Sequence, residues 1–260
     1  MGLSMMCWRT PKSSASTSES KLPEHIILAD GVHAGYGDAE VLRGASLRLD
    51  RGEIIGVIGS NGVGKTTMLR TIAGLLPVRG GAMQAFGRNV GKTEPLELRL
   101  AGLGYVPQER NVFPNLGVRE NLETAYRVAG PRARKIDLAE RLGFVEGLFP
   151  RLAERRTQHA GLMSGGEQRM VAIGMGLMLK PQALLLDEPT TGLAPVVVHE
   201  LMKTIRKLRD TEGISILLVE QNIASLVKVV DRLYVMKDGA CREFDGAPED
   251  LARLNIWEYL

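Results

Sequence analysis

Cysteine, strong net charge and long apolar runs are scarce or missing in this sequence. Two cysteines occur among 260 residues, at Cys7 and Cys241, and their spacing matches no metal-binding or redox motif. So few thiols favour a reducing, cytosolic setting. The formal net charge is only +3 and no long basic run occurs, which argues against a nucleic-acid partner. No apolar run is long enough to cross a bilayer, so work at a membrane would require another chain to span it.

What is present is the composition of an ordinary globular domain, with 44% hydrophobic and 24% charged residues. The length predicts one large domain, or one domain with an insertion. Residues 1–24 are rich in Ser and are predicted to be a disordered tail. A lipidation signal is not expected there, because Met6 stands where Ser or Thr is required. The short apolar start also makes a poor signal peptide.

Apolar runs typical of buried strands alternate with helical patterns along the chain. Strands are predicted at 26–28, 41–49, 54–58, 103–106, 183–187 and 214–219, and a hairpin at 233–244. Helices are predicted at 66–73, 118–128, 135–142, 198–209 and 223–230. Turns are expected at 35–37 and at 51–52, the second as a hairpin. This alternation predicts an α/β fold with a parallel sheet that is covered on both faces.

The stretch from Gly59 to Thr67 organises the rest of the chain. It matches G-x-x-x-x-G-K-[ST], and it follows the apolar run 54–58 and precedes a helical pattern, which is the context of a phosphate-binding loop. Glycines let backbone N–H groups turn inward, and the following helix adds its positive end. The alternative is a glycine turn with a chance lysine. The nucleotide-binding candidates are Gly59, Ser60, Asn61, Gly62, Val63, Gly64, Lys65, Thr66 and Thr67.

An acidic pair follows the apolar run at 183–187. Asp187 ends the run, as the Mg²⁺-binding carboxylate of a phosphate-loop enzyme does, and the Thr66 hydroxyl is a second candidate ligand. Glu188 is a candidate base, or an orienting group for water, at a γ-phosphate. The alternative is a surface acidic pair before Pro189, but the presence of Lys65 favours the catalytic interpretation.

A second glycine-containing motif, Ser164-Gly-Gly-Glu-Gln168, begins a helical run where hydroxyl and free N–H groups can bind an anion. Alone it would be interpreted as a helix cap. Together with the loop at 59–67, Gln108 after a strand, and Leu184-Leu-Leu-Asp-Glu188, it resembles the motif set of ABC-type ATPases. The resemblance covers about 25–250. Within that family, the stretches 105–122, 188–195 and 218–222 are similar to the ATP-binding subunits of branched-chain amino-acid importers. The urea and short-amide importers are close relatives.

The resemblance implies a P-loop nucleotide-binding core, an antiparallel β subdomain and a helical subdomain at about 109–178, within an ABC ATPase domain at 25–260. It implies ATP and Mg²⁺ as cofactors, with Thr66, Gln108 and Asp187 at the metal and Glu188, Gln221 and Gln108 in catalysis. Tyr36 is a candidate to stack on the purine, the alternative being a packing role. Ser164, Gly165, Gly166 and Glu167 would complete the site of a second ATPase subunit, either a sister chain or a copy of this one.

The implied partners are integral-membrane permease subunits and, indirectly, a periplasmic or extracellular binding protein. The implied location is peripheral, on the cytoplasmic face of the inner or plasma membrane. The docking surface is predicted at 109–122, where Val112, Phe113, Leu116 and Val118 offer apolar contact, although some of them are expected to fill the core instead.

Three positions depart from the family pattern. Gln221 replaces the usual switch His, the stretch 192–195 lacks the usual Asp, and Met175 stands where many members have Arg. Gln can donate a hydrogen bond but cannot carry a proton at neutral pH. The first two departures also occur in the branched-chain subgroup. Two alternatives remain open: a soluble ABC ATPase of DNA repair or translation, disfavoured by the single phosphate loop and the lack of heptads, and a nucleotide-binding scaffold without catalysis.

Overall fold

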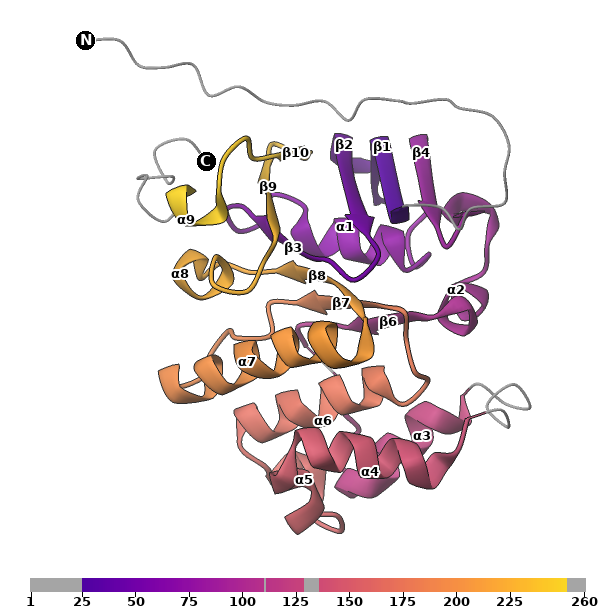
Figure 1. The fold of residues 1–260 in the computed structure, drawn as a ribbon. Coiled ribbons are helices and arrows are strands. Elements are labelled where there is room, and N and C mark those ends of the chain that lie inside the picture. The colour runs from indigo at the N-terminus through magenta and orange to yellow at the C-terminus, as the bar shows by residue number, and fades with distance from the viewer. Residues whose placement is uncertain (1–24, 110, 129–135, 252–260) are drawn as a thin grey trace.

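The computed structural model of this protein describes residues 25–109, 111–128 and 136–251. Figure 1 shows three layers in this part of the chain: an antiparallel sheet, a central sheet, and a group of helices on the far side of the central sheet. The predicted tail at 1–24 lies outside the described residues. The α/β fold class predicted from the sequence is confirmed.

The central sheet is built from the apolar runs that the sequence predicted as buried strands. Its strands are β3 (Ile54–Ile58), β6 (Leu103–Val106), β7 (Ala183–Asp187), β8 (Ser215–Val219), β9 (Arg232–Lys237) and β10 (Ala240–Glu243). Their spatial order is β10-β9-β3-β8-β7-β6. The five neighbouring strands β9, β3, β8, β7 and β6 are parallel to one another. Strand β10 pairs antiparallel with β9 through the predicted hairpin. Because β3, β7 and β8 are buried at every position, both faces of the sheet are covered.

The other sheet is antiparallel and contains a long hairpin. Its strands are β1 (His25–Tyr36), β2 (Ala39–Asp50), β4 (Gly80–Ala85) and β5 (Arg88–Asn89), in the order β2-β1-β4-β5. The turn predicted at 35–37 begins two residues later, at Gly37, because Tyr36 still pairs with Ala39 and the turn falls at 37–38. The turn at 51–52 exists but makes no hairpin. Strand β3 pairs with parallel strands on both of its edges and leaves none for β2.

Some helices lie between the two sheets, and a larger group lies on the far side of the central sheet (Figure 1). Between the sheets lies α1 (Lys65–Ile72), with α2 (Pro95–Ala101) and the short η1 (Val90–Lys92) nearby. The helical group contains α3 (Val118–Arg127), α4 (Leu138–Leu148), α5 (Pro150–Glu154), η3 (Ala160–Leu162) and α6 (Gly165–Leu177). The remaining helices are α7 (Pro195–Glu212), α8 (Ile223–Leu226) and α9 (Pro248–Leu251).

Predicted helix bounds are shifted in the structure, and for two helices the contacts explain the shift. The helix predicted at 135–142 begins at Leu138, because the Asp137 carboxylate accepts hydrogen bonds from the N–H groups of Ala139 and Glu140 and caps it. Lys135 itself lies outside the described residues. The helix predicted at 223–230 ends at Leu226, since the chain must turn into β9, where the Asp231 N–H already donates to the Ile54 carbonyl.

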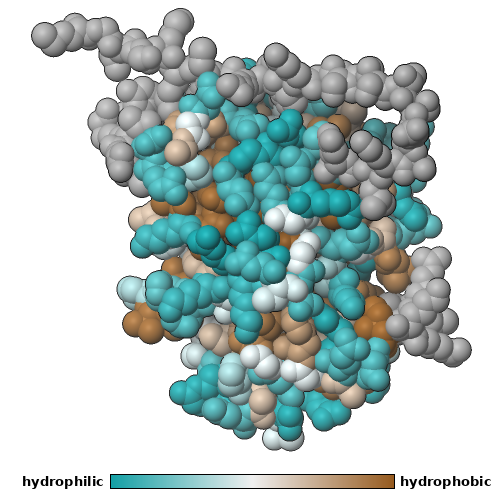
Figure 2. All heavy atoms as spheres, in the orientation of Figure 1, coloured by the Kyte–Doolittle hydropathy of each residue, from teal (hydrophilic) through white to brown (hydrophobic). Residues whose placement is uncertain are grey.

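The core has two parts, one on each face of the central sheet. One part lies between the two sheets around α1, and the other lies between the central sheet and the helices α3 to α7. The face drawn in Figure 2 is mostly hydrophilic, with hydrophobic side chains in small patches. Within the described ranges, none of the helices is both long enough and apolar enough to cross a bilayer.

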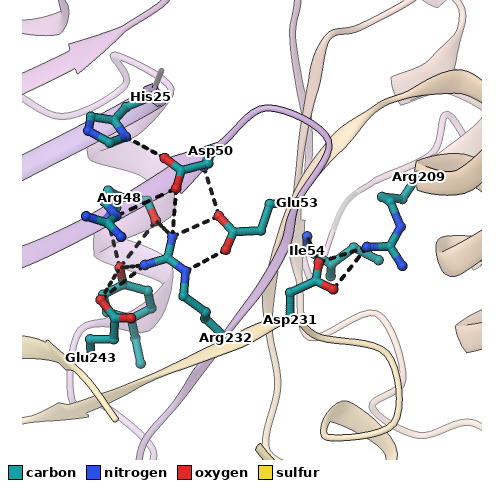
Figure 3. Close-up of polar contacts among 10 residues, drawn as sticks. His25, Arg48, Asp50, Glu53, Ile54, Arg209, Asp231, Arg232 and Glu243 are labelled. Carbon is teal, nitrogen blue, oxygen red and sulfur yellow. Dashed lines mark hydrogen bonds and ion pairs between the residues drawn. The ribbon is translucent and has the colours of Figure 1, made fainter. Parts of the chain in front are cut away.

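An arginine-centred network joins the two sheets (Figure 3). The Arg232 guanidinium, on β9, donates to both carboxylate oxygens of Glu53, with Nη2 to Oε2 at 2.8 Å. It also lies 3.1 Å from Glu243 on β10 and 3.5 Å from Asp50 at the end of β2. Since its carboxylate partners come from both sheets and their connecting turn, Arg232 holds the antiparallel sheet against the central one.

Candidate functional site

The loop between β3 and α1 can form only with glycine at two of its positions. At Gly59, an added Cβ would lie 2.6 Å from the carbonyl oxygen of Met236, which no side chain tolerates. Gly64 caps α1 in a left-handed conformation with φ of +115°, and an added Cβ would lie 3.1 Å from Leu42. These glycines bring the loop close to its neighbours and present the N-terminus of α1 to the cavity above it.

Lys65 is buried at the base of this loop and turned back on it. Its Nζ donates to the carbonyl oxygens of Gly59 at 2.8 Å and Ser60 at 3.0 Å, and it lies 3.7 Å from Oε1 of Glu188. Burial lowers the pKa of the ammonium group, and the Glu188 carboxylate opposes that change. The site therefore holds a cationic donor with acidic partners around it.

Catalytic candidates meet at one edge of the central sheet because the strands are parallel. Gln108 follows β6, Glu188 follows β7 and Gln221 follows β8, and these strands are neighbours in the order β8-β7-β6. The carboxyl ends of parallel strands share one edge, which is where ligands bind in such sheets. The sequence predicted each of these residues separately, and the sheet brings them together.

Asp187 and Thr66 form a pair suited to a hard cation. The Thr66 hydroxyl donates to Oδ1 of Asp187 at 3.1 Å. The other oxygen, Oδ2, is buried, and in the described part of the chain no hydrogen-bond partner reaches it. Burial raises the pKa of Asp187, and the Thr66 hydrogen bond opposes the change. A buried carboxylate oxygen without a partner, next to a hydroxyl, is a donor set that fits Mg²⁺.

Glu188 is held in a single orientation by donors from three loops. Among the described residues, its Oε2 accepts hydrogen bonds from Gln221 Nε2 at 2.8 Å, Gln108 Nε2 at 2.9 Å and the Thr191 hydroxyl at 3.1 Å. Its backbone adopts a left-handed φ of +44°, rare for a residue with a side chain. A buried carboxylate fixed in this way is suited to act on a group bound in the adjoining cavity.

These residues surround a cavity of about 350 Å³. Its lining residues are Asn61, Gly62, Gly64, Lys65, Thr66, Thr67, Gln108, Glu188 and Gln221. Gly59 and Ser60 contribute carbonyl oxygens to Lys65 from behind the lining, and Val63 packs against the core. Asp187 is not part of this lining, but it contacts the lining residue Thr66 through their hydrogen bond.

The motif at 164–168 is not part of this cavity. Ser164 caps α6, where its Oγ accepts from the Glu167 N–H at 3.4 Å and donates to Oε2 of Glu167 at 2.9 Å. Glu167 also lies 3.3 Å from Arg155. Gly165 has open space where a Cβ would be, whereas a Cβ on Gly166 would lie 3.1 Å from Val197. The motif is thus separate from the lysine and carboxylates of its own chain.

Tyr36 stands beside the loop helix rather than in the cavity. The residue is 42% exposed, and its hydroxyl accepts a hydrogen bond from Arg70 of α1 at 3.1 Å. An exposed ring fixed at its hydroxyl end leaves its face accessible to a planar group. The stacking role predicted for it is compatible with this position.

Sequence reasoning missed three residues that position the site. Thr191 bonds to Glu188, and its place three residues further along the same loop could have signalled this. Arg70 holds Tyr36, a contact between distant segments that left no local signal. Glu220 is buried, and its carboxylate accepts the N–H groups of Thr190 at 2.8 Å and Gln221 at 3.2 Å. Burial raises the pKa of Glu220, and the Thr190 hydrogen bond opposes that change.

Comparisons with known proteins agree with this geometry. The model of the ABC transporter family matches residues 42–191. A high-affinity branched-chain amino acid transport ATP-binding protein, BraG of Pseudomonas aeruginosa, is 40% identical over 82% of this chain and 90% of its own length. The probable branched-chain amino acid transport ATP-binding protein LivF of Archaeoglobus fulgidus is 34% identical over 88% of this chain and 95% of its own length.

Solved structures show the same architecture. The structure of an ATP-binding subunit of an ABC transporter superposes with a TM-score of 0.75 at 26% identity, covering 88% of this chain and 92% of that one. A crystal structure of the ADP conformation of an ATP-binding cassette of an ABC transporter has a TM-score of 0.76 at 25% identity, covering 90% of this chain and 97% of that one. From its motifs, fold and relatives, the chain belongs to the ABC transporter family, as a nucleotide-binding ATPase subunit with the P-loop fold.

Proposed function

We propose that this chain hydrolyses ATP with Mg²⁺ to power an importer of branched-chain amino acids. The observation that carries the catalytic part is the convergence of Gln108, Gln221 and Thr191 on Glu188, which lines one cavity with Lys65. The relatives BraG and LivF support the choice of substrate. The proposed domain extends over 25–260, with its helical subdomain at about 109–178.

Each polar side chain of the cavity has a proposed role toward ATP. Lys65 exchanges its carbonyl partners for β- and γ-phosphate oxygens, and the loop residues 59–67 donate backbone N–H groups to the same phosphates. Tyr36 stacks on the adenine. Thr66, Asp187 and Gln108 hold Mg²⁺, which neutralises charge on the β- and γ-phosphate oxygens when bound.

Glu188 is the proposed base for the attacking water. Its bonds to the two glutamines and Thr191 keep the carboxylate in place, so it needs no reorganisation when the water arrives. Gln221 takes the place of the family's histidine as a neutral donor to the γ-phosphate. Gln108 connects this carboxylate to the metal.

The motif at 164–167 is proposed to complete the site of a second ATPase subunit. Support comes from its position, since Ser164, Gly165, Gly166 and Glu167 do not line the cavity of their own chain. Leu162 and Val196, near this motif, are exposed by 77% and 76% and would be covered by such a subunit. Closing the two chains around ATP would exclude water from the γ-phosphate.

A permease subunit is the proposed occupant of an apolar groove between α2, β6 and α3. This cavity of about 460 Å³ is lined by apolar side chains that are half exposed, namely Leu75, Leu96, Phe113 and Val128. Its polar lining includes Asn111, which follows Gln108 in the loop from the nucleotide cavity. Of the predicted docking residues, Phe113 is exposed and available. Val118 is one of the residues that fill the core instead, because it is 1% exposed and packs in the helical core.

With these partners, the proposed location of the subunit is the cytoplasmic face of the inner or plasma membrane, and an external binding protein delivers the substrate to the permease. The test is substrate uptake by vesicles that contain the complete transporter. ATP-dependent uptake of labelled leucine is expected, and a vesicle set with the Lys65→Ala chain is the control. Uptake of urea or a short amide, with no uptake of leucine, would show that the transported substrate is not a branched-chain amino acid. ATP turnover in the vesicles that does not change with the transported substrate would contradict the transport role.

A further inference from the structure

A second cavity lies beside the nucleotide site, and we infer that it binds a small organic acid that regulates hydrolysis. The cavity has a volume of about 670 Å³ and is bounded by α7 and by the segment that leads from β8 into α8. Figure 1 shows α8 next to the beginning of α7, and the two helices are in contact. This volume lies within the range of small-molecule sites in proteins, about 300–1,000 Å³. We call it the α7–α8 pocket.

The floor of the α7–α8 pocket is apolar. It is formed by Leu193, Pro195, Val198, Met202 and Val229. Val198, Met202 and Val229 are at most 8% exposed and belong to the core, so the floor is fixed by packing. A ligand with an aliphatic body could displace water from this floor and gain free energy by doing so.

The remaining lining of the α7–α8 pocket is polar and includes three basic side chains. Its basic side chains are Lys203, Arg206 and Lys228, and the Lys203 ammonium also donates to Glu200 on the same helix at 3.0 Å. Among the described lining residues Glu220 is the single acid, and its carboxylate is bound to the backbone N–H groups of Thr190 and Gln221. Arg206 is held near Lys228 by one hydrogen bond, from Nη1 to the Lys228 carbonyl at 3.4 Å. An excess of positive charge over an apolar floor selects an anion with an apolar body.

The pocket is poorly suited to a nucleotide. Within the described lining no aromatic ring other than the His199 imidazole occurs, so a base would have little surface on which to stack. Inorganic phosphate could use the cations but would leave the apolar floor in contact with water. The combination therefore favours a compact aliphatic carboxylate.

Occupancy of the pocket can reach the catalytic carboxylate through shared residues. Gln221 lines both the α7–α8 pocket and the nucleotide cavity, and its amide donates to Glu188. Thr191, another residue of the pocket, donates to the same oxygen of Glu188. A ligand that shifts either donor changes the orientation of Glu188. This regulatory step depends on the catalytic role proposed for Glu188, whereas binding of the acid does not.

Binding is tested on the full chain without nucleotide, by NMR of ¹³C-methyl-labelled methionine. The Met202 methyl, assigned by its loss in Met202→Leu, reports on the floor of the pocket, and Met68 beside the phosphate loop is the control signal. Titration with 4-methylpentanoate is expected to shift Met202 and leave Met68 unchanged. The uncharged 4-methylpentanamide and inorganic phosphate are each expected to bind roughly tenfold more weakly, because the amide lacks the negative charge and phosphate lacks the aliphatic body.

Charge variants decide whether the cations hold the acid. Arg206→Gln and Lys228→Gln should each weaken 4-methylpentanoate binding by roughly tenfold. Lys207→Gln changes an exposed charge on the same helix outside the pocket, and it should have little effect. Equal binding of the acid and the amide, unchanged binding in both pocket variants, or no shift of Met202 would overturn the assignment.

Regulation is tested separately, by ATP turnover of the complete transporter with and without 4-methylpentanoate. Turnover should change, and the change should disappear in Arg206→Gln while Lys207→Gln retains it. By reciprocity, a bound ATP analogue should then change the affinity for the acid by the same factor as the acid changes the affinity for the analogue. Binding at Met202 with no change in turnover would overturn the regulatory step but would still support binding of the acid in the α7–α8 pocket. If the complete transporter with the native chain hydrolysed no ATP at all, that result would instead contradict the proposed function.

Discussion

The side-chain amide of Gln221 lies 2.8 Å from Oε2 of Glu188, so the residue that replaces the family's switch histidine is in direct contact with the proposed base. Gln221 follows β8 and Glu188 follows β7, and the two strands pair in parallel register up to Asp187 and Val219. The contact is therefore fixed by the sheet. It provides a neutral donor where an imidazole would add an ionisable group.

Replacing Gln221 should slow hydrolysis without preventing nucleotide binding. A donor to a charged oxygen contributes about 1.5–3 kcal/mol, which is roughly one to two decades in rate if the bond forms only in the transition state. Gln221→Ala should lose that factor in turnover. Gln221→His should keep substantial activity and add an ionisation near neutral pH that the native chain lacks. Turnover measured against pH in the assembled transporter checks both, and native turnover in Gln221→Ala would make Gln221 a bystander.

Glu188→Gln should bind ATP and accumulate as a closed pair of subunits. The amide keeps the shape of the carboxylate but loses its basicity, so the step after binding stops. Size-exclusion chromatography with ATP and Mg²⁺ should show the pair, and the native chain under the same conditions should return to single subunits as ATP is consumed. Normal hydrolysis by the variant would assign the base to another residue.

Alanine variants of Phe113 and Val118 should distinguish a loss of docking to the permease from a loss of stability. Phe113 is 47% exposed in the apolar groove, so Phe113→Ala should change the free energy of unfolding by about 0.5 kcal/mol or less and reduce uptake by the transporter. Val118 is 1% exposed, so Val118→Ala should lower the free energy of unfolding by about 2 kcal/mol through the cavity it leaves. Denaturant titrations and uptake assays give the two quantities. An equal loss of stability in both variants would assign Phe113 to the core.

Removing Arg232 should destabilise the junction between the two sheets. Arg232 and Glu53 are 19% and 13% exposed, and Arg232→Met leaves the Glu53 carboxylate without its main partner, at a cost of about 3 kcal/mol in the free energy of unfolding. The control is Arg209→Met, which breaks the more exposed pair with Asp231 in Figure 3 and should cost about 1 kcal/mol or less. Equal losses in the two variants would show that Arg232 does not join the sheets.

The site could be predicted from the sequence where its chemistry is local. Lys65 is identified by the loop around it, and Asp187 and Glu188 by the strand they end. Their meeting with Gln108 and Gln221 also follows once the strands are parallel, since strand ends share an edge. Arg70 with Tyr36 and Arg232 with Glu53 could not be predicted, because each joins segments whose relative position depends on the pairing of distant strands. That Val118 would be the buried member of the docking candidates could not be predicted for a similar reason, since its side chain faces the helical core only through the packing of α3 against α6.

The central claim, that the cavity around Lys65 hydrolyses ATP to drive transport, is tested most directly by ATP turnover of the complete transporter with Lys65→Ala. Lys65 is the buried cation of the cavity, so its loss should reduce turnover to the background of the assay. Lys92→Ala, an exposed lysine of η1, is the matched control and should keep native turnover. Near-native turnover in Lys65→Ala would contradict the account, because the triphosphate would then be bound and cleaved elsewhere.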